Sequence, residues 1–229
     1  SLCIMENAHH ALLAVVCDGI GGGNAGDVAS KMAVDHMKEA FLSCKELKND
    51  QDVKRWLEKV IQEANDMVFT QSTRDEKLKG MGTTIVGLVT QEVTTYIFSA
   101  GDSRTYGLYQ DDFLCLTEDH SYVAAMMRAG ELTEEQARNH PEKNVITRAI
   151  GVAWEVKADF FEVDLKPGDK VMMCSDGLSN MVEDQRLYDV ISSNSVEDSV
   201  RILIDEAKEN GGYDNITVIV IEARIEEGN

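Results

Sequence analysis

Apolar residues follow two different periods in the first third of the chain. The short run at 11–17 is apolar throughout and stops at Asp18-Gly19, a pattern that predicts a buried strand. From 27 to 44, apolar residues recur at helical spacing behind Asp27, a candidate N-cap, and the same period returns at 51–73. This part of the chain therefore predicts one strand followed by two amphipathic helices.

The middle and end of the chain are dominated by β-branched and aromatic runs that short polar turns separate. These runs predict an antiparallel meander and later strands at 83–90, 94–100, 104–109, 113–117, 156–165, 170–175 and 215–223. A helix is predicted at 196–209. Strands mixed with pairs of helices, without a regular βαβ rhythm, indicate an α+β fold in layers. Because no repeat, linker or low-complexity tract interrupts the pattern, we expect one domain over 1–229.

The segment between Asp119 and Asn144 differs from its surroundings. It is polar and helix-prone, and Thr133 to Gln136 has the sequence of a capping box. We expect a flap inserted at about 121–145.

Composition and charge then exclude several classes of function. The chain has 229 residues, and 22 Lys plus Arg against 41 Asp plus Glu give a net charge of −19, which disfavours nucleic acid and membrane surfaces as partners. The apolar run at 11–17 is too short to span a bilayer. Five cysteines without CxxC spacing suggest neither a disulfide framework nor a zinc site, so we expect a cytoplasmic protein.

Three aspartates share one local pattern, in which an apolar strand adjoins an Asp beside Gly or Asn. They are Asp18, Asp176 and Asp214; the first two follow their strands and the third precedes its strand. If the strands are antiparallel, all three carboxylates meet at one edge, where their repulsion requires a cation. Oxygen donors without His or Cys favour Mg²⁺ or Mn²⁺ over zinc.

The chain resembles bacterial type 2C (PPM family) metal-dependent Ser/Thr protein phosphatases. Seven blocks carry the resemblance in order: VVCDGIGGGNAGDVAS at 15–30, GMGTTIVG at 80–87, SAGDSRTY at 99–106, LTEDHS at 116–121, NHPEKNVITRAIG at 139–151, MMCSDGLSNMV at 172–182 and GGYDNITVIV at 211–220. The resemblance implies a central antiparallel β-sandwich flanked by helices on both faces. It also implies that the flap is a mobile segment beside the active site.

The resemblance further assigns roles to individual residues. It makes Asp18 the ligand that bridges two Mn²⁺ or Mg²⁺ ions, with the Gly19 carbonyl on one ion and Asp176 and Asp214 completing the other. Asp119 matches a position that helps to hold a third ion together with Asp176. A water between the metals then attacks phosphoserine or phosphothreonine of a protein directly. The implied partners are phosphoproteins and a bacterial eukaryotic-like Ser/Thr kinase that the enzyme opposes, and we expect a monomer.

Two departures from the family pattern bear on catalysis. Ile20 stands where animal members have a histidine regarded as the general acid, so another proton source is needed. Ser1-Leu2-Cys3 resembles the sequence just after the family's first strand and its Asn-Glu/Gln-Asp triplet, and no Arg precedes Arg55 to anchor the phosphate. If the chain were complete, we would expect weak activity and an unpaired edge of the sandwich.

Other interpretations are left open by the sequence. A phosphatase-like binding module with weak or no activity would follow from the missing first strand, whereas the intact aspartates oppose it. A phosphatase of anti-sigma antagonists would keep the chemistry and change the substrate. A calcium-binding β-sandwich would explain the carboxylates but not the other blocks.

Overall fold

The computed structural model describes residues 1–22, 24–45, 47, 49–91, 94–110 and 112–224. Within them, five antiparallel strands form a first sheet in the order β1-β2-β5-β6-β9. Its strands are β1 (Leu2–Glu6), β2 (Leu12–Val16), β5 (Ile85–Gln91), β6 (Thr94–Ala100) and β9 (Asp159–Asp164). The alternating residues of β2, β5 and β6 give this sheet two apolar faces.

A second antiparallel sheet has four strands in the order β11-β10-β7-β8. It consists of β7 (Arg104–Tyr109), β8 (Asp112–Cys115), β10 (Lys170–Cys174) and β11 (Val218–Glu222). Beyond one end of β2 and β5 lies a short antiparallel pair, in which β3 (Gly19–Ile20) follows β2 and β4 (Gly82–Thr83) precedes β5. The two large sheets face each other across a buried apolar layer formed by Ala14, Val16, Val86, Leu88, Ile97, Val171, Met173 and Ile219.

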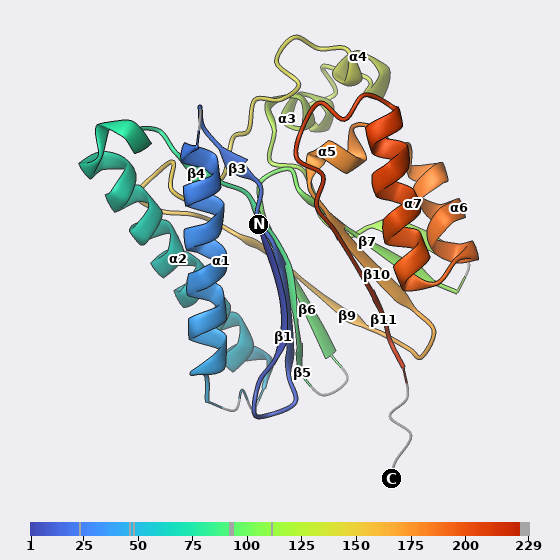
Figure 1. The fold of residues 1–229 in the computed structure, drawn as a ribbon, viewed down its shortest axis with the longest axis horizontal. Coiled ribbons are helices and arrows are strands. Elements are labelled where there is room, and N and C mark those ends of the chain that lie inside the picture. Colours follow the sequence, from blue (N-terminus) through green and yellow to red (C-terminus); the bar gives the residue numbers. More distant parts are fainter. Residues whose placement is uncertain (23, 46, 48, 92–93, 111, 225–229) are drawn as a thin grey trace.

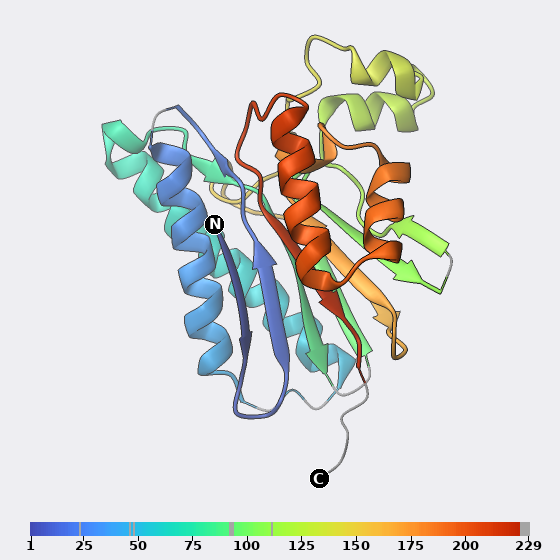
Figure 2. The same cartoon turned by 45° about the vertical axis from the view of Figure 1, so that its right-hand side comes forward.

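Helices cover the outer faces of both sheets (Figures 1 and 2). The long helices α1 (Ala25–Leu42) and α2 (Asp50–Arg74) pack on the first sheet, and the 3-10 turn η1 (Glu76–Leu78) follows α2. On the second sheet lie α5 (Asp176–Ser179), α6 (Asp184–Ser193) and α7 (Val196–Glu209). The predicted α+β fold, a β-sandwich with helices on both faces, is confirmed.

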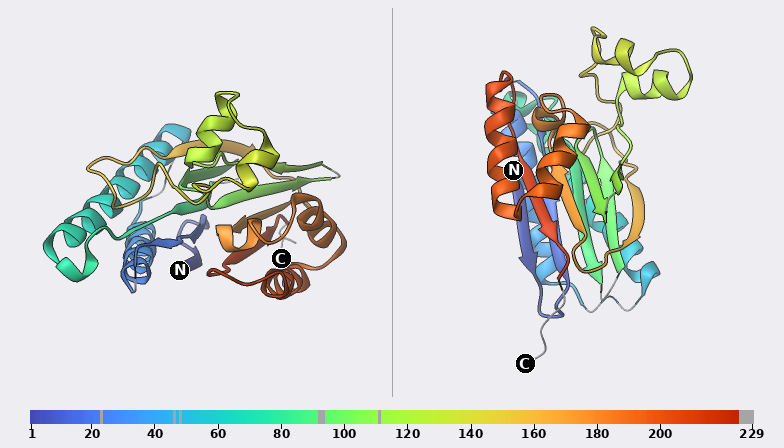
Figure 3. Two further views of the ribbon diagram at one scale, coloured as in Figure 1. Left: turned by 90° about the horizontal axis from the view of Figure 1, so that it is seen from above. Right: turned by 90° about the vertical axis from the view of Figure 1, so that its right-hand side faces the viewer.

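The segment 121–145 contains two short helices, α3 (Tyr122–Arg128) and α4 (Glu134–Arg138). It projects from one end of the sandwich, at the end where α5 and the start of α6 lie (Figure 3). The predicted capping box is present: Thr133 accepts a hydrogen bond from the Gln136 backbone, and the Gln136 side chain accepts one from the Thr133 backbone. This box starts α4 in a segment that contributes little to the three apolar cores.

Most predicted elements are present, and the differences have local causes. The prediction that Asp27 caps the first helix is wrong, because the helix begins two residues earlier behind Asn24 and Asp27 lies in its first turn. The predicted strand 83–90 is divided into β4 and β5, because Thr84 between them belongs to neither strand. The strand β1 and the helix α6 had no prediction. No described helix is long and apolar enough to cross a membrane.

Candidate active site

The three aspartates predicted to converge lie at one end of the sandwich. Asp18 follows β2, whereas Asp176 follows β10 and Asp214 precedes β11. Because β10 and β11 are antiparallel, with Cys174 opposite Val218, the end of one strand lies beside the start of the other. Figure 1 shows β3, β4, α5 and α3 together at this end. Both sheets therefore contribute carboxylates to one location.

Two threonine hydroxyls fix the backbone of Asp18. The Thr84 hydroxyl accepts a hydrogen bond from the Asp18 amide at 3.0 Å, and the Thr83 hydroxyl donates one to the Asp18 carbonyl at 2.8 Å. The Thr84 amide donates a second bond to that carbonyl at 2.8 Å. Both threonines are fully buried, so these bonds are shielded from water. Asp18 is held by the neighbouring strands as well as by its own.

Asp176 and Asp214 are joined through Ser175. Its hydroxyl donates to the Asn215 carbonyl at 2.9 Å and accepts from the Thr217 amide at 3.0 Å. A Cβ atom at Gly177 would lie 2.4 Å from the Asn215 carbonyl oxygen, so the two segments approach more closely than any side chain permits. The glycine of this DG pair is therefore required for packing as well as for turning the chain.

The electrostatics of the site show that the carboxyl groups are close together. Burial, together with the charges of Asp176 and Asp214 and a hydrogen bond with Asp176, raises the pKa of Asp18 to about 7. Burial, followed by the charge of Asp214, also raises the pKa of Asp176. The three predicted aspartates thus lie in one acidic cluster, in which the charges of Asp176 and Asp214 oppose ionisation of Asp18.

A fourth carboxyl, Asp102, belongs to this cluster and was not predicted to contact metal. It lies in the tight turn between β6 and β7, behind Gly101, whose φ of +131° favours glycine. Burial raises the pKa of Asp102 to about 7, with Asp176 and Asp119 as the next causes. The GDSR block contained this residue, but an Asp in a short turn is most often a turn former. The sequence therefore gave no separate signal for it.

Asp119 borders the cluster but is already paired. Both of its oxygens accept hydrogen bonds from Arg104, at 2.8 Å from Nε and 2.7 Å from Nη2. Among the described residues, no three His, Cys, Asp or Glu side chains are grouped so as to hold a metal ion. Asp214 is exposed, and its Oδ1 accepts a hydrogen bond from the Asn215 amide at 2.7 Å.

His120 follows Asp119 in the sequence, but the contacts of its side chain are structural. Its Nδ1 accepts a hydrogen bond from the Gly101 amide, and its Nε2 lies 2.9 Å from Asp159. Arg148 donates to the same Asp159 carboxylate at 2.8 Å. Burial lowers the pKa of His120 below its ordinary value. The ring is therefore a neutral link between the loop that precedes α3 and strand β9.

A cleft of about 610 Å³ opens between the segment 121–145 and the body of the protein. The carboxyls of Asp102, Asp119 and Asp176 lie at one side of it. Apolar side chains from both walls and charged side chains line the remainder: Val123, Ala124, Met127, Ala137, Met181, Val182, Glu134, Arg138, Lys143, Glu183 and Asp184. Arg138 of α4 lies 3.7 Å from Glu183 across the cleft.

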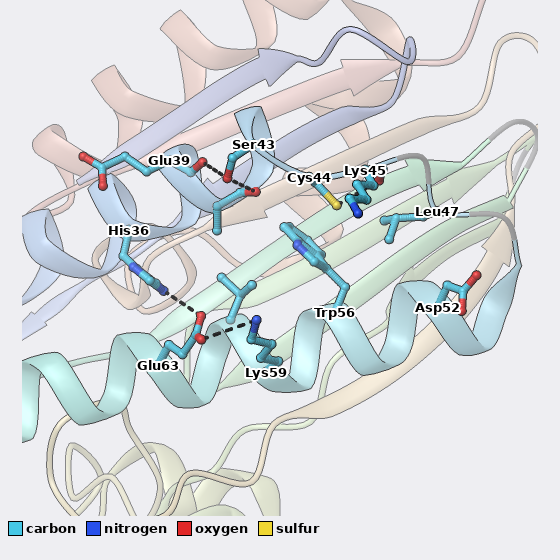
Figure 4. Close-up of a pocket in the computed structure, with 12 residues that line it drawn as sticks. His36, Glu39, Ser43, Cys44, Lys45, Leu47, Asp52, Trp56, Lys59 and Glu63 are labelled. Carbon is cyan, nitrogen blue, oxygen red and sulfur yellow. Dashed lines mark hydrogen bonds and ion pairs between the residues drawn. The ribbon is translucent and has the colours of Figure 1, made fainter.

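A second cavity, of about 560 Å³, lies between α1 and α2 (Figure 4). Glu63 is its central charged group, 3.5 Å from His36 and 3.7 Å from Lys59, and Trp56 forms an apolar wall. None of the predicted site residues lines it. The acidic cluster and the cleft beside it are therefore the candidate active site.

Comparisons with known proteins place the chain in a family. The protein phosphatase 2C family matches residues 2–222. The serine/threonine phosphatase Stp of Listeria welshimeri is 39% identical over 223 residues, which cover 97% of this chain and 88% of that protein. The protein phosphatase PhpP of Streptococcus pneumoniae strain D39 is 35% identical over 214 residues, which cover 93% of this chain and 86% of that protein.

Solved structures agree with this. The Streptococcus agalactiae serine/threonine phosphatase has a TM-score of 0.92 and 32% identity, covering 97% of this chain and 92% of that one. The PstP catalytic domain in complex with two manganese ions has a TM-score of 0.84 and 27% identity, and the match covers 98% of this chain and 91% of that one.

The chain belongs to the protein phosphatase 2C family. Its class of activity is that of a protein-serine/threonine phosphatase, as the sequence blocks implied, and divalent-metal dependence is a feature of the family.

The raised pKa of Asp18 predicts how the metal-free protein responds to pH. The pKa of this carboxyl rises from 3.8 to about 7 on folding, so its contribution to the stability of the folded state is complete at pH values below 3.8. The contribution is lost as the pH rises through about 7. The melting temperature of chelator-treated protein should therefore fall between about pH 5 and about pH 8. The melting temperature of Asp18→Asn should fall less over this range, because the amide does not titrate. The control is Asp205→Asn, an exposed carboxyl on α7; equal falls in wild type and Asp18→Asn would contradict the prediction.

Proposed function

We propose that this phosphatase hydrolyses phosphoserine and phosphothreonine on a Mn²⁺ or Mg²⁺ centre held by Asp18, the Gly19 carbonyl, Asp176 and Asp214. The observation that supports it most is that carboxyls from both sheets meet at one end of the sandwich, where burial and the charges of Asp176 and Asp214 raise the pKa of Asp18 to about 7. Such a cluster is unfavourable when all its members are ionised, and divalent cations remove the repulsion.

The chemistry of the donors fits these ions. The cluster offers carboxylate and carbonyl oxygens, and Cys17 and Cys174 beside it are fully buried thiols whose pKa values burial raises. Hard oxygen donors suit Mg²⁺ and Mn²⁺, whereas thiolates would suit zinc. When bound, such ions attract the phosphate dianion and lower the pKa of water.

The chain's own residues supply the positioning. Thr83 and Thr84 fix the backbone of Asp18, so its carboxyl projects from a rigid point. The Asn180 side chain donates to Asp176 Oδ2 at 3.1 Å, which orients that carboxylate. These contacts hold the ligands before any ion binds, which reduces the ordering that metal binding requires.

A third ion is part of the proposal, with a changed set of ligands. The resemblance implied Asp119 and Asp176 as its ligands, but both oxygens of Asp119 are engaged by Arg104. Asp102 is half-buried and has no side-chain cation bound to it among the described contacts, and the charge of Asp176 is one of the causes that raise its pKa. We therefore favour Asp102 with Asp176 for this ion.

The remaining proposals concern the cellular setting. Phosphoproteins are the substrates that the class implies, and we propose that a Ser/Thr kinase supplies them. The described cysteines are all free, which supports a reducing compartment such as the cytoplasm. We propose that the protein acts as a monomeric single domain over 1–229, with the flap at 121–145 as an insertion.

Hydrolysis of an aryl phosphate tests the proposed centre. We expect turnover with Mn²⁺ and none after chelation. Asp18→Asn and Asp214→Asn should each lose more than about 100-fold of the turnover, which is more than the loss typical of residues that only support the metal ligands. Asp205→Asn, which removes an exposed carboxyl on α7, should retain full activity. Undiminished turnover in Asp18→Asn would contradict the assignment, and a wild type inactive under all conditions would favour a binding module.

The cleft supports a role for the flap in selecting protein substrates. Its flap wall includes Met127, which is 36% exposed, and flexible apolar methionines suit varied side chains of a bound protein. An aryl phosphate needs only the acidic side of the cleft. We propose that the flap changes position when a phosphoprotein binds.

Replacing 121–145 by the equivalent segment of a relative should alter turnover of a phosphoprotein more than that of an aryl phosphate. Met127→Asp is a smaller change with the same expected direction, about tenfold in kcat/KM for the phosphoprotein. Met67→Asp on α2, also at an exposed methionine, is the matched control. Equal effects on both substrates would contradict the role of the flap.

A further inference from the structure

Trp154 is a large apolar side chain on the surface, outside the acidic cluster and the cleft. It is 73% exposed, although its indole rests against Phe69 of α2 with 5.1 Å between the ring centroids. Val152 is 50% exposed and lines a hollow together with Phe69. We call Phe69, Val152 and Trp154 the Trp154 platform. Exposed apolar groups gathered in this way, with a tryptophan among them, are typical of surfaces that bind other proteins.

The loop that carries Trp154 is held firmly on α2. Asn65 is fully buried; it accepts a hydrogen bond from the Gly151 amide at 2.8 Å and donates one to the Trp154 carbonyl at 3.1 Å. Gln62, one turn earlier, accepts from the Val156 amide at 3.2 Å and donates to the Trp154 carbonyl at 2.9 Å. Because these bonds fix the backbone on both sides of the tryptophan, a partner that binds its indole orders little of the chain.

Carboxylates surround this loop. The side-chain amide that donates to the Trp154 carbonyl at 2.9 Å also donates to Asp66 Oδ1 at 2.7 Å, so Asp66 lies beside the platform. Glu155 is the next residue, and it lines a hollow of about 840 Å³ with Glu58 and Lys157. None of the three carboxylates takes part in an ion pair among the described residues. The surroundings of the platform therefore favour a partner that brings positive charge.

An exposed indole among carboxylates suits a guanidinium group in particular. Arginine stacks on aromatic faces through cation–π attraction, and its planar fork of donors pairs with carboxylates at the same time. Nucleic acid and anionic lipid are disfavoured by these carboxylates and by the net charge of −19. The platform therefore fits an arginine-bearing segment of a protein.

The course of the chain limits the distance from the platform to the proposed metal centre. Thr83 pairs with Gly19 and with Ile150, so the Cα atoms of Gly19 and Ile150 are at most about 11 Å apart. Trp154 lies four residues after Ile150 and therefore within about 14 Å of it. An extended peptide of about eight residues spans the whole distance, which is at most about 25 Å. One protein segment can therefore reach both places.

We propose that the Trp154 platform is a docking site for an arginine-bearing segment of the phosphoprotein substrate, within about eight residues of the phosphorylated serine or threonine. This inference rests on the proposed function, because it takes the occupant to be a substrate. The segment is held equally in the bound substrate and in the transition state, so docking lowers KM and leaves kcat unchanged. Aryl phosphates have no such segment, and their hydrolysis does not depend on the platform.

Phosphothreonine peptides that differ only in charge test the docking. Each carries a run of arginines, or of citrullines as neutral isosteres, about eight residues before or after the phosphothreonine. With Mn²⁺ present, the wild type should have a kcat/KM about fivefold higher for the arginine peptide in at least one placement, through KM. Trp154→Ala should bring this ratio close to one, and Trp154→Phe should keep most of it because an aromatic face remains. Asp66→Asn should lower it in part.

Leu42→Ala on α1 is the matched control, since it truncates another exposed apolar side chain, at 60% exposure. It should keep the ratio of the wild type. Turnover of an aryl phosphate should be equal in all these variants, which also shows that they are folded. Equal ratios in the wild type and Trp154→Ala would overturn the inference, because the preference for arginine would then come from net charge alone. A wild type without any preference would overturn it as well.

Peptide binding separates this inference from the proposed function. The fluorescence anisotropy of a labelled arginine peptide that carries no phosphate measures docking without turnover, and the wild type should bind this peptide about fivefold more tightly than Trp154→Ala does. Full turnover together with equal binding by the wild type and Trp154→Ala would overturn the docking site alone. A wild type that hydrolyses neither peptide nor aryl phosphate would overturn the proposed function, and with it the assignment of the occupant as a substrate.

Discussion

Repulsion among carboxyl groups at one end of a β-sandwich is the constraint on which the active site depends. Asp18 comes from the first sheet and Asp176 and Asp214 from the second, and the raised pKa of Asp18 reflects both burial and the charges of its neighbours. The buried threonines and the Ser175 contacts keep these groups together in spite of that repulsion. In the proposed centre, stability given up here would be recovered when cations bind, which would link folding, metal binding and phosphate attraction through the same few side chains.

The aspartates at this end divide into two kinds. Asp119 is neutralised within the protein by Arg104, which is held in turn by Tyr106. The others have no such partner among the described contacts, and in the proposed centre they would be neutralised by divalent ions. The two kinds of aspartate lie within one acidic region although only one of them is paired inside the protein.

Sequence reasoning predicted the parts of the molecule in which one signal dominated. The apolar periodicity of β2 and α7, the box at Thr133 and the three aspartates at strand ends each follow from local pattern and antiparallel geometry. Contacts between distant residues carried no such signal. That Asp102 joins the cluster and Asp119 pairs with Arg104 depends on how a turn and a strand meet in space. The strand β1 is exposed at Leu2 and Ile4, so it lacks the continuous apolar pattern by which β2 is recognised.

The location of bound Mn²⁺ tests the central claim most directly. Crystals of the chain grown with Mn²⁺ and measured at the manganese absorption edge give anomalous peaks that locate the ions independently of the protein atoms. We expect two peaks that share Asp18, with Asp176 and Asp214 on one of them. Peaks distant from these side chains, or none at saturating Mn²⁺, would contradict the assignment of this end of the sandwich as the catalytic metal centre.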